Sequence, residues 1–358
     1  MELNEVLKKA KELNASDIFI VAGQPVTLKV YNKMISLEDE DGEITKLTPE
    51  KTNQMINDIY EQADHRDNSK LKLHGDDDFS FSVPALSRYR VSTYKQRGSY
   101  AAVIRMISFD LPQASELGIP DSIINLVDIN KGLILVTGPA GSGKSTTQAC
   151  MIDHINKTAT KHIITLEDPI EHLHRHNKSI VSQREISIDS DSYVTALRAA
   201  LRQAPDVILL GEMRDLETIS IALTAAETGH TVISTLHTIG AATTIDRIID
   251  VFPANQQHQV ALQLSLTLET VISQQLVPTV DNKLMPVFEV MKVTPAIRNM
   301  IRDNKVHQID GIIASSADEQ MLSMDNSLVE AYKAGKITEE TALTYAMNTE
   351  IIKRKLSA

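Results

Sequence analysis

The sequence predicts a protein of two domains, a small α+β domain followed by a larger α/β domain with a helical end. Its 358 residues are enough for two or three domains. Residues 1–107 alternate between helix-like and strand-like patterns. After residue 120, short continuous apolar runs alternate with helical patterns, which is typical of a buried parallel sheet. Residues 108–120 contain two prolines and a glycine and are predicted to be a linker.

The first domain is predicted to combine two helices with an antiparallel sheet. Apolar residues of the N-terminal segment form one helical stripe. A second helical pattern begins at Thr48, a good helix cap, with Pro49 directly after it. Strand patterns cover the segments 17–23, 25–35, 77–84, 87–96 and 99–107.

The second domain, residues 121–358, is predicted to contain four buried strands. Their apolar runs cover residues 132–138, 162–168, 206–212 and 231–237. A mostly helical subregion is expected from about residue 255. It is predicted to begin with one long helix over residues 255–276 and to end in helical patterns over residues 337–356.

Composition narrows the class of protein. Apolar residues make up 42% and charged residues 23%, as in an ordinary globular protein, and the net charge of -11 argues against a nucleic-acid binder that relies on overall charge. A single cysteine, Cys150, excludes an internal disulfide and a four-cysteine zinc site. The first residues do not form a signal peptide, and no apolar run approaches the roughly 20 residues that span a bilayer. We expect a cytoplasmic protein that docks on any membrane machine from outside the bilayer.

A phosphate-binding loop follows the first apolar run of the second domain. The segment GPAGSGKST matches the spacing G-x-x-x-x-G-K-[ST] between a predicted strand and a predicted helix. Backbone N–H groups of such a loop surround phosphates, its lysine neutralises their charge, and its Ser145 hydroxyl would bind Mg²⁺. We expect the phosphates of ATP to contact Gly138, Gly141, Ser142, Gly143, Lys144, Ser145 and Thr146.

Acidic residues follow two later strands. The segment TLEDPIEH carries Glu167, Asp168 and Glu171, and the segment VILLGEMRD carries Glu212 and Asp215. Ligands of open α/β sheets bind at the carboxyl ends of the strands, where carboxylates can hold Mg²⁺ or orient water. Gly211 stands where an aspartate usually follows such a strand, so Glu212 must serve the metal or the water. Each carboxylate could instead cap a helix or lie on the surface, and Asp168 could be only a turn residue.

Two histidines flank the last predicted strand, His230 before it and His237 after it. We expect both to touch the nucleotide site or a seam between subunits, although a lone histidine is more often structural. A histidine metal site is not expected, because no cluster of cysteines and histidines surrounds them.

The order of these motifs resembles that of the secretion-type motor ATPases. GPAGSGKSTT, TLEDPIEH, ALRQAPDVILLGEMRD and AAETGHTVISTLHT resemble the Walker A, Asp, Walker B and His boxes of that family. The chain length, the RYRV strand and the segment AIRNMIRD are most similar to the type IV pilus retraction ATPases. The resemblance implies a PAS-like N-terminal domain, a RecA-like ATPase domain and a homo-hexameric ring with ATP at its seams.

The resemblance also implies roles for individual residues. Arginines of the N-terminal domain reach the phosphates in this family, and the matching candidates are Arg88, Arg90 and Arg105. Alternatively, Arg88 and Arg90 share one solvated strand face. Glu167 would orient or activate the attacking water and Glu212 would support Mg²⁺ through water, although the two could exchange roles.

A short helix is predicted within TPAIRNMIRD, far from the boxes. Its apolar face would pack inside the domain, and Thr294 and Pro295 suit its start. Because the boxes account for ATP chemistry, we expect Arg298, Asn299 and Arg302 to contact a partner or a neighbouring subunit. The alternative is a solvated face with weak repulsion between the two arginines.

These expectations combine into a hexameric ATP-driven motor for pilus retraction that acts on an inner-membrane platform protein without binding nucleic acid. Residues 111–120 would act as its hinge. Alternatives of the same class are an accessory retraction, secretion, pilus-extension or conjugation ATPase. Extension ATPases usually carry a longer N-terminal region and a four-cysteine module, which counts against them. Alternatives of other classes are a nucleotide-gated regulatory protein with negligible turnover and a DNA-translocating ring.

Overall fold

The computed structural model describes residues 2–30, 33–38, 42–84, 86–107, 111–316 and 320–356. The chain divides into two compact units, residues 1–110 and residues 111–358. Within the described ranges, no helix combines the length and the apolar character that crossing a bilayer requires.

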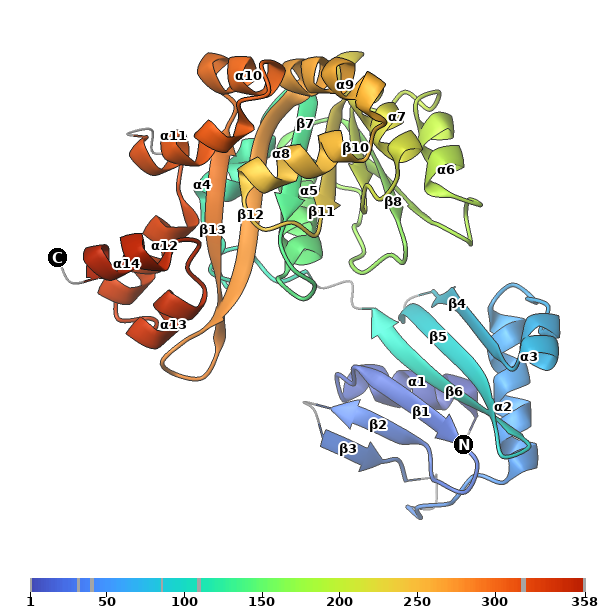
Figure 1. The fold of residues 1–358 in the computed structure, drawn as a ribbon. Helices are drawn as coiled ribbons and strands as arrows, with labels where there is room; N and C mark the ends of the chain where they lie inside the picture. The colour runs from blue at the N-terminus through green and yellow to red at the C-terminus, as the bar shows by residue number, and fades with distance from the viewer. Residues whose placement is uncertain are drawn as a thin grey trace. The chain divides into compact units, whose positions relative to one another are not determined.

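The first unit is an antiparallel sheet with helices on one face (Figure 1). Its sheet order is β3-β2-β1-β6-β5-β4. The strands are β1 (Asp17–Val21), β2 (Thr27–Val30), β3 (Lys33–Ser36), β4 (Asp76–Val83), β5 (Ser87–Gln96) and β6 (Ser99–Ile107). The helices are α1 (Leu3–Glu12), α2 (Pro49–Gln62) and α3 (Ser69–His74). Thr48 caps α2 as predicted, because its side chain accepts a hydrogen bond from the Lys51 N–H.

One predicted strand of this unit is wrong. Residues 25–35 form two antiparallel strands rather than one, with Val30 paired to Lys33 and Lys29 paired to Met34. The chain between them, Tyr31 and Asn32, lies outside the described residues. The alternation of apolar and polar residues continues from one strand into the next, so a pattern of period two did not reveal the reversal.

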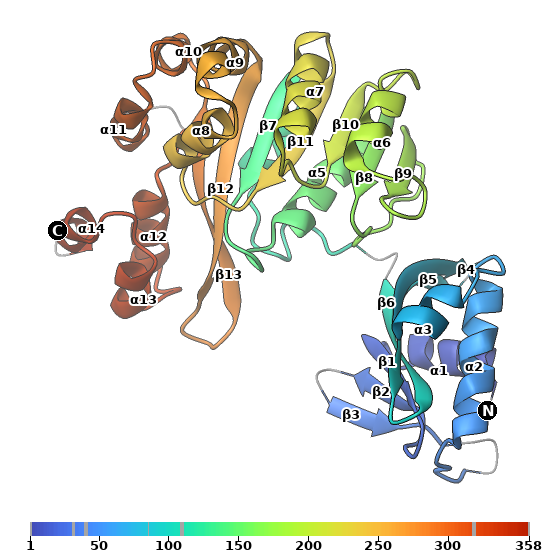
Figure 2. The same cartoon turned by 45° about the vertical axis from the view of Figure 1, so that its right-hand side comes forward.

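The second unit contains a seven-stranded sheet, in which β13 alone runs antiparallel to its neighbour. The order β13-β12-β7-β11-β10-β8-β9 is followed across Figure 2. The strands are β7 (Gly132–Thr137), β8 (His162–Glu167), β9 (Ile180–Glu185), β10 (Val207–Leu210), β11 (Thr231–Leu236), β12 (Leu268–Pro278) and β13 (Leu284–Lys292). The four predicted apolar runs are β7, β8, β10 and β11.

Helices cover both faces of this sheet. Alternate residues of β10 divide between two apolar clusters, Ile208 and Leu210 in one and Val207 and Leu209 in the other. The second cluster includes residues of α4 (Asp121–Ile124), η1 (Asn125–Val127) and α5 (Lys144–Thr158). The first cluster includes residues of α6 (Tyr193–Ala200), α7 (Leu216–Glu227), α8 (Ala241–Asp250), α9 (Ala254–Thr267), α10 (Pro295–Arg302), η2 (Val306–Gln308) and α11 (Ile309–Ser315).

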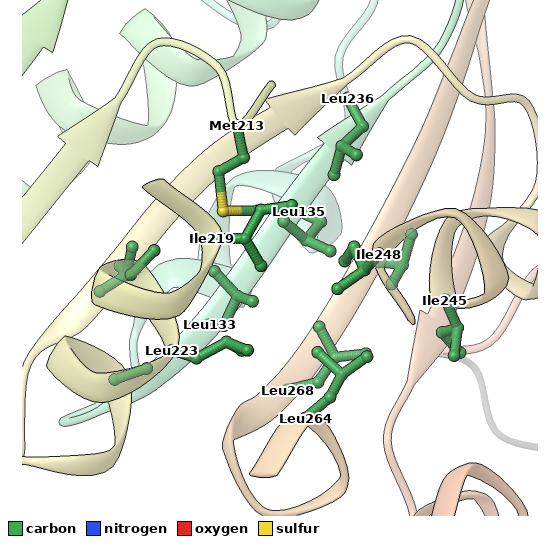
Figure 3. Packing of buried hydrophobic residues seen from close by; sticks show 14 of the residues in the cluster. Leu133, Leu135, Met213, Ile219, Leu223, Leu236, Ile245, Ile248, Leu264 and Leu268 are labelled. Carbon is green, nitrogen blue, oxygen red and sulfur yellow. The ribbon is translucent and has the colours of Figure 1, made fainter. Parts of the chain in front are cut away.

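The first cluster holds α7, α8 and α9 onto the sheet. Figure 3 shows Leu133 and Leu135 of β7 among Ile219 of α7, Ile248 of α8 and Leu264 of α9. All five side chains are fully buried. Burial of one such side chain contributes about 1.5–3 kcal/mol, so these contacts fix the helices that lead into and out of the strand ends.

The predicted long helix over residues 255–276 is wrong. Helix α9 ends at Thr267, and the chain continues as β12, which pairs with β7 on one side and β13 on the other. Thr270, Val271 and Ile272 favour a strand, and pairing in the sheet overrides the apolar pattern that resembled a helix. The expected helical subregion is therefore interrupted by two strands and resumes at Pro295.

The chain ends in a group of three helices that we call the C-terminal module. It comprises α12 (Met324–Lys333), α13 (Glu339–Thr344) and α14 (Thr349–Leu356), which gather beside β13 in Figures 1 and 2. Leu328, Ala342 and Ile352 of these helices pack in one cluster with Val277 of β12 and Val287 of β13.

Residues 111–120, which the sequence assigns to a linker, pack against the second unit. Leu111, Ala114 and Leu117 are partly buried against the cluster that includes α5, and Ile119 is fully part of that cluster. Residues 108–110 lie outside the described residues.

Arg298 is held by contacts within its own chain, which favours a structural role over the predicted partner contact. Thr294 caps α10 and its apolar residues pack inward as predicted. The Arg298 Nη1 atom, however, donates to the Ser265 carbonyl at 2.8 Å and to the Leu268 carbonyl at 3.3 Å, and Nη2 lies 2.8 Å from a Glu269 carboxylate oxygen. Arg298 therefore satisfies the carbonyl end of α9. Asn299 and Arg302 are exposed.

These contacts predict that replacing the two arginines of α10 has different effects on stability. Arg298→Ala should lower the free energy of unfolding by about 1–3 kcal/mol, because it removes charged hydrogen bonds to partly buried carbonyls. Arg302→Ala should change it by less than about 0.5 kcal/mol, since the ion pair of Arg302 is with the neighbouring Asp303 carboxylate at the surface. Urea denaturation measures both, and equal stabilities would contradict the capping role.

Candidate active site

The phosphate loop joins β7 to α5 with the geometry of an anion site. Helix α5 begins at Lys144, and its cap residue Gly143 has a φ of 87° and no side chain to satisfy the helix N–H groups. These N–H groups and the helix dipole favour an anion at this end. The Lys144 Nζ atom is buried and donates to the carbonyls of Gly138 and Pro139, each at 2.8 Å.

A strand that the sequence misassigned supports this loop. A Cβ atom on Gly138 would lie 2.1 Å from the backbone oxygen of Gln274 in β12, and one on Gly143 would lie 2.9 Å from the Gln274 Nε2 atom. The Thr147 hydroxyl of α5 donates to Gln274 Oε1 at 2.7 Å. The loop therefore needs these two glycines for close packing as well as for positive φ. Gln274 was missed because its segment was expected to be helical.

A cavity of about 290 Å³ adjoins the loop. It is lined by side chains at the carboxyl ends of β7, β8, β10 and β11, as the rule for open sheets predicts. Predicted residues that line it are Gly141, Lys144, Ser145, Glu167, Asp168, Glu171, Glu212 and His237. Lining residues that the sequence reasoning missed include Gln148, His172, His174, Tyr193 and Arg214. The three alternating histidines after Glu171 were the available signal for His172 and His174.

Glu167 lines this cavity and is partly exposed, with protein groups close around its carboxyl group. Burial raises the pKa of its carboxyl group to about 7, although hydrogen bonds from Thr165 and Gln183 act in the opposite direction. The Thr165 hydroxyl donates to Glu167 Oε1 at 2.7 Å and the Gln183 amide donates to the same atom at 3.3 Å. A carboxylate whose pKa lies near neutrality is suited to accept a proton.

Glu212 lies in a row of charged groups with the loop lysine. The Lys144 Nζ atom lies 3.4 Å from His237 Nδ1, and His237 Nε2 lies 3.5 Å from a Glu212 carboxylate oxygen. Arg214 forms an ion pair with the other Glu212 carboxylate oxygen. Burial lowers the pKa of Lys144, whereas the Glu212 and Glu171 carboxylates raise it. His237 therefore lies between the loop lysine and a carboxylate.

Crowding explains the glycine that precedes Glu212. A Cβ atom on Gly211 would lie 2.9 Å from the Tyr193 hydroxyl and 3.3 Å from the Leu166 carbonyl oxygen. An aspartate at this position would displace its neighbours. The carboxylate therefore comes from Glu212, one residue further, as the sequence indicated.

The structure does not bring His230 to this cavity within one chain. His230 precedes β11, whereas His237 follows it, and a six-residue strand is about 20 Å long. The His230 ring lies 3.0 Å from the Ala225 carbonyl through Nδ1. If His230 touches a nucleotide site as predicted, that site must be on a different subunit. Asp215 fits the structural alternative, since it caps α7 by accepting the Thr218 N–H at 2.8 Å.

The three candidate arginines of the first unit lie together on one sheet face. Arg90 of β5 is directly opposite Arg105 of β6, and Arg88 lies two residues along the same strand. Arg105 Nε donates to the Asp17 carboxylate at 2.9 Å, and Arg88 donates to the Ser82 hydroxyl at 3.4 Å. Two cations directly opposite each other destabilise a sheet unless an anion lies between them.

The residues of the cavity fit a magnesium ion. Ser145, Glu167 and Glu212 provide a hydroxyl and two carboxylates, and Mg²⁺ prefers such oxygen ligands in addition to phosphate and water. In the part of the chain that the structure describes, no group of three or more His, Cys, Asp and Glu side chains could hold a metal ion by itself.

A second cavity, of about 280 Å³, lies next to the same loop. It touches Gly143 and Thr146, whereas the first cavity touches Ala140, Gly141 and Ser145. Its other walls are largely apolar, formed by Glu116, Leu117, Ile119, Gln274, Leu276, Leu284 and Pro286. An apolar cleft beside a phosphate loop suits a nucleotide base.

The chain is similar in sequence and in structure to known proteins. The chain is 42% identical, over 96% of its length and 97% of the relative's, to the type IV pilus retraction ATPase PilT of Pseudomonas aeruginosa. It is 47% identical to a twitching motility protein of Neisseria gonorrhoeae, over 76% of this chain and 73% of that protein. A crystal structure of the pilus retraction motor PilT with bound ADP superposes with a TM-score of 0.88 and 45% identity, and covers 99% of both chains.

This structural similarity confirms the predicted fold class, an N-terminal α+β domain followed by a RecA-like ATPase domain. The family model described as type II/IV secretion system protein matches residues 1–306, most of the chain. Together with the relatives, which span both units, this match means that the chain belongs to the type II/IV secretion system protein family, as its boxes predicted.

Proposed function

We propose that this chain is an ATP-hydrolysing motor, assembled as a hexamer, that powers the retraction of type IV pili. The convergence of Lys144, Ser145, Glu167 and Glu212 in one cavity at the strand ends carries the proposal. Its relatives with this fold are named as pilus retraction and twitching motility proteins. Loss of the gene should leave cells with more surface pili, whereas an extension motor would leave them with few, and that outcome would contradict retraction.

The nucleotide is bound with its phosphates on the loop and its base in the apolar cleft. Backbone N–H groups at the start of α5 and the Lys144 ammonium neutralise the phosphates. To reach them, Lys144 exchanges its present hydrogen bonds with the loop carbonyls for bonds to phosphate oxygens. The cleft with Leu117 and Leu276 accepts the base, which places the terminal phosphate towards Glu167 and Glu212.

The two carboxylates have different tasks because their surroundings differ. Glu167 accepts a proton from the attacking water or orients it, since its carboxyl group is buried and titrates near neutrality. Glu212, with His237 and Arg214 beside it, supports the Mg²⁺ ion and its waters together with Ser145. The ion supplies neutralisation of charge on the transferring phosphoryl group.

Arg88, Arg90 and Arg105 complete the site across a subunit seam. Their face also carries Lys29, which lies directly opposite Asp17, and Asp17 is the carboxylate paired with Arg105. A phosphate is the anion that this arrangement favours, because guanidinium groups bind it with two parallel hydrogen bonds. Closure of the first unit of one subunit onto a nucleotide of the next would then follow ATP binding, and hydrolysis would reverse it.

The motor acts on an inner-membrane platform protein from the cytoplasmic face. Asn299 and Arg302 of α10 remain as partner contacts, whereas Arg298 does not. Helix α9, which packs against α10, exposes Leu262 and Leu266, at 40% and 61% of their surface. An exposed apolar pair beside polar residues is typical of a protein-binding surface.

Glu212→Gln should abolish turnover while ATP binding is retained. The amide keeps the size of the side chain but loses its charge, and loss of such a group costs at least about 100-fold in rate. Phosphate release and equilibrium binding of a fluorescent ATP analogue measure the two properties. Glu217→Gln is the matched control, because Glu217 forms only a surface ion pair with Arg198. Full turnover by the Glu212 variant would refute the assignment, and no phosphate release by the unmodified hexamer would favour a regulatory protein.

The pH dependence of kcat tests the role of Glu167. The base must be deprotonated, so kcat should fall about tenfold per pH unit below a midpoint near the pKa of about 7. Thr165→Val removes a hydrogen bond that lowers this pKa, so the midpoint should move to higher pH. A midpoint that stays in place in this variant would show that another group titrates.

The partner contacts of α10 are tested with retraction and hydrolysis measured together. Asn299→Ala combined with Arg302→Ala should abolish twitching in cells while the purified protein keeps its ATPase rate. Asp303→Ala removes only the carboxylate beside Arg302, so it should preserve twitching. A parallel loss of hydrolysis in the double variant would instead place this face at a subunit seam.

A further inference from the structure

A buried carboxylate outside the nucleotide cavity binds the start of α8. Glu289 of β13 is directly opposite Ser273 of β12 in the antiparallel pair. Glu289 Oε1 accepts the Ala241 N–H at 2.8 Å, and the Ser273 hydroxyl oxygen accepts the Gly240 N–H at 3.0 Å. Gly240, the cap residue of α8, has no side chain to accept these bonds. The two strands therefore supply the cap that α8 itself lacks.

The same carboxylate also binds the C-terminal module. Glu289 Oε2 lies 3.4 Å from the backbone nitrogen of Met324, the first residue of α12, and accepts its N–H. One side chain thus contacts the positive ends of two helices that lie far apart in the sequence. Nearby, the Met347 Cε atom lies 3.4 Å from the position that a Cβ atom on Gly240 would take.

Because Glu289 is buried, its contacts with the starts of α8 and α12 depend strongly on their geometry. Glu289 is 6% exposed, and within the described residues no Lys, Arg or His forms an ion pair with it. Burial raises the pKa of its carboxyl group, the N–H groups of Ala241 and Met324 lower it, and Asp310 and Asp325 raise it further. A buried carboxylate of this kind relies on both helix ends, so losing either contact leaves an unsatisfied oxygen.

The helix that Glu289 caps continues directly from the nucleotide cavity. His237 lines that cavity, and residues 238–240 connect it to α8. Farther along α8, Ile245 and Ile248 are packed in the core, as Figure 3 shows. With one end of α8 fixed there, a shift of the His237 loop, residues 237–240, acts mainly on the first turn of the helix, where Glu289 binds.

We propose that Glu289 is a positioning residue that couples the His237 loop to the C-terminal module. It holds His237 in reach of Lys144 and Glu212, and it passes a displacement of the loop to the first turn of α12. The proposal rests on the role proposed above for His237 in hydrolysis. In this proposal, the C-terminal module responds to the presence of nucleotide.

Glu289→Gln tests the coupling, with Asp325→Asn as its matched control. The amide nitrogen of glutamine must face one of the two N–H donors, so one helix start loses its acceptor. Asp325 is also buried and also accepts two backbone N–H groups, from Met347 at 2.7 Å and Asn348 at 3.1 Å, but both lie within the C-terminal module. Loss of a cap alone should therefore lower the melting temperature of both variants.

Only the Glu289 variant should change hydrolysis. We expect kcat to fall about tenfold or more, with KM for ATP within about twofold, because the phosphate loop is intact while His237 is misplaced. Asp325→Asn should keep kcat near the unmodified value. Equal kcat values in the two variants at matched stability would overturn the positioning role.

Hydrogen exchange tests the transmission without using activity. In the unmodified protein, MgADP should slow exchange of the Ala241 and Met324 amides together, and in Glu289→Gln the response of Met324 should disappear while that of Ala241 remains. Independent responses of the two amides in the unmodified protein would overturn the proposal, even if a variant failed to fold. The exchange experiment needs only ADP binding. Its outcome therefore does not depend on whether the protein hydrolyses ATP or drives retraction.

Discussion

The second unit depends on the support that β12 gives to the phosphate loop. A loop of backbone N–H groups binds phosphate well only when it is held open, because a free chain would turn these groups towards water or its own carbonyls. Gln274 prevents this with its backbone oxygen against Gly138 and its side-chain amide between Gly143 and Thr147. Since β12 pairs along β7, the loop is supported by the same sheet from which it emerges.

The chemistry of the cavity follows from how two glutamates are surrounded. Glu167 lies among uncharged hydrogen-bond donors, and burial of its carboxyl group raises the pKa to about 7. Glu212 instead lies beside His237 and Arg214, and its carboxylate forms an ion pair with Arg214. The two acids occupy equivalent positions at two strand ends, but their neighbours give them different surroundings. One group is suited to proton transfer and the other to holding charge.

Local patterns in the sequence predicted the strands and the phosphate loop, because their evidence lies within a few residues. Continuous apolar runs predicted β7, β8, β10 and β11, and the glycine spacing predicted the loop between β7 and α5. Residues of the site that come from distant segments of the chain were not predicted. Gln274 lies over a hundred residues after the loop. Its strand was mistaken for helix because β12 is buried on both faces, so its sequence lacks the simple apolar–polar alternation of a half-buried strand.

The arginines of α10 also show that sequence patterns do not reveal neighbours in space. The spacing of Arg298 and Arg302 predicted a common exposed face, but spacing cannot reveal that the carbonyl end of α9 lies beside one of them. His230 and His237 looked equivalent around one strand, although a strand separates its two ends by its full length. In both cases the tertiary neighbour decided the role, and no pattern along the chain contains that neighbour.

The alternation of β12 explains why a nucleotide site and a distant helical module can respond to each other. Gln274 faces the phosphate loop, whereas Ser273 and Gln275 face the opposite side of the sheet, where Ser273 binds Gly240 and Gln275 donates to the Tyr345 carbonyl at 3.2 Å. Packed strands and helices move as rigid pieces rather than deform smoothly. A displacement of the phosphate loop is therefore felt on both faces of β12. Glu289, on the adjacent strand β13, is placed to transmit this displacement to α12. Three successive polar residues in a buried strand cost burial energy, and their contacts to three separate segments are the physical reason that the strand contains them.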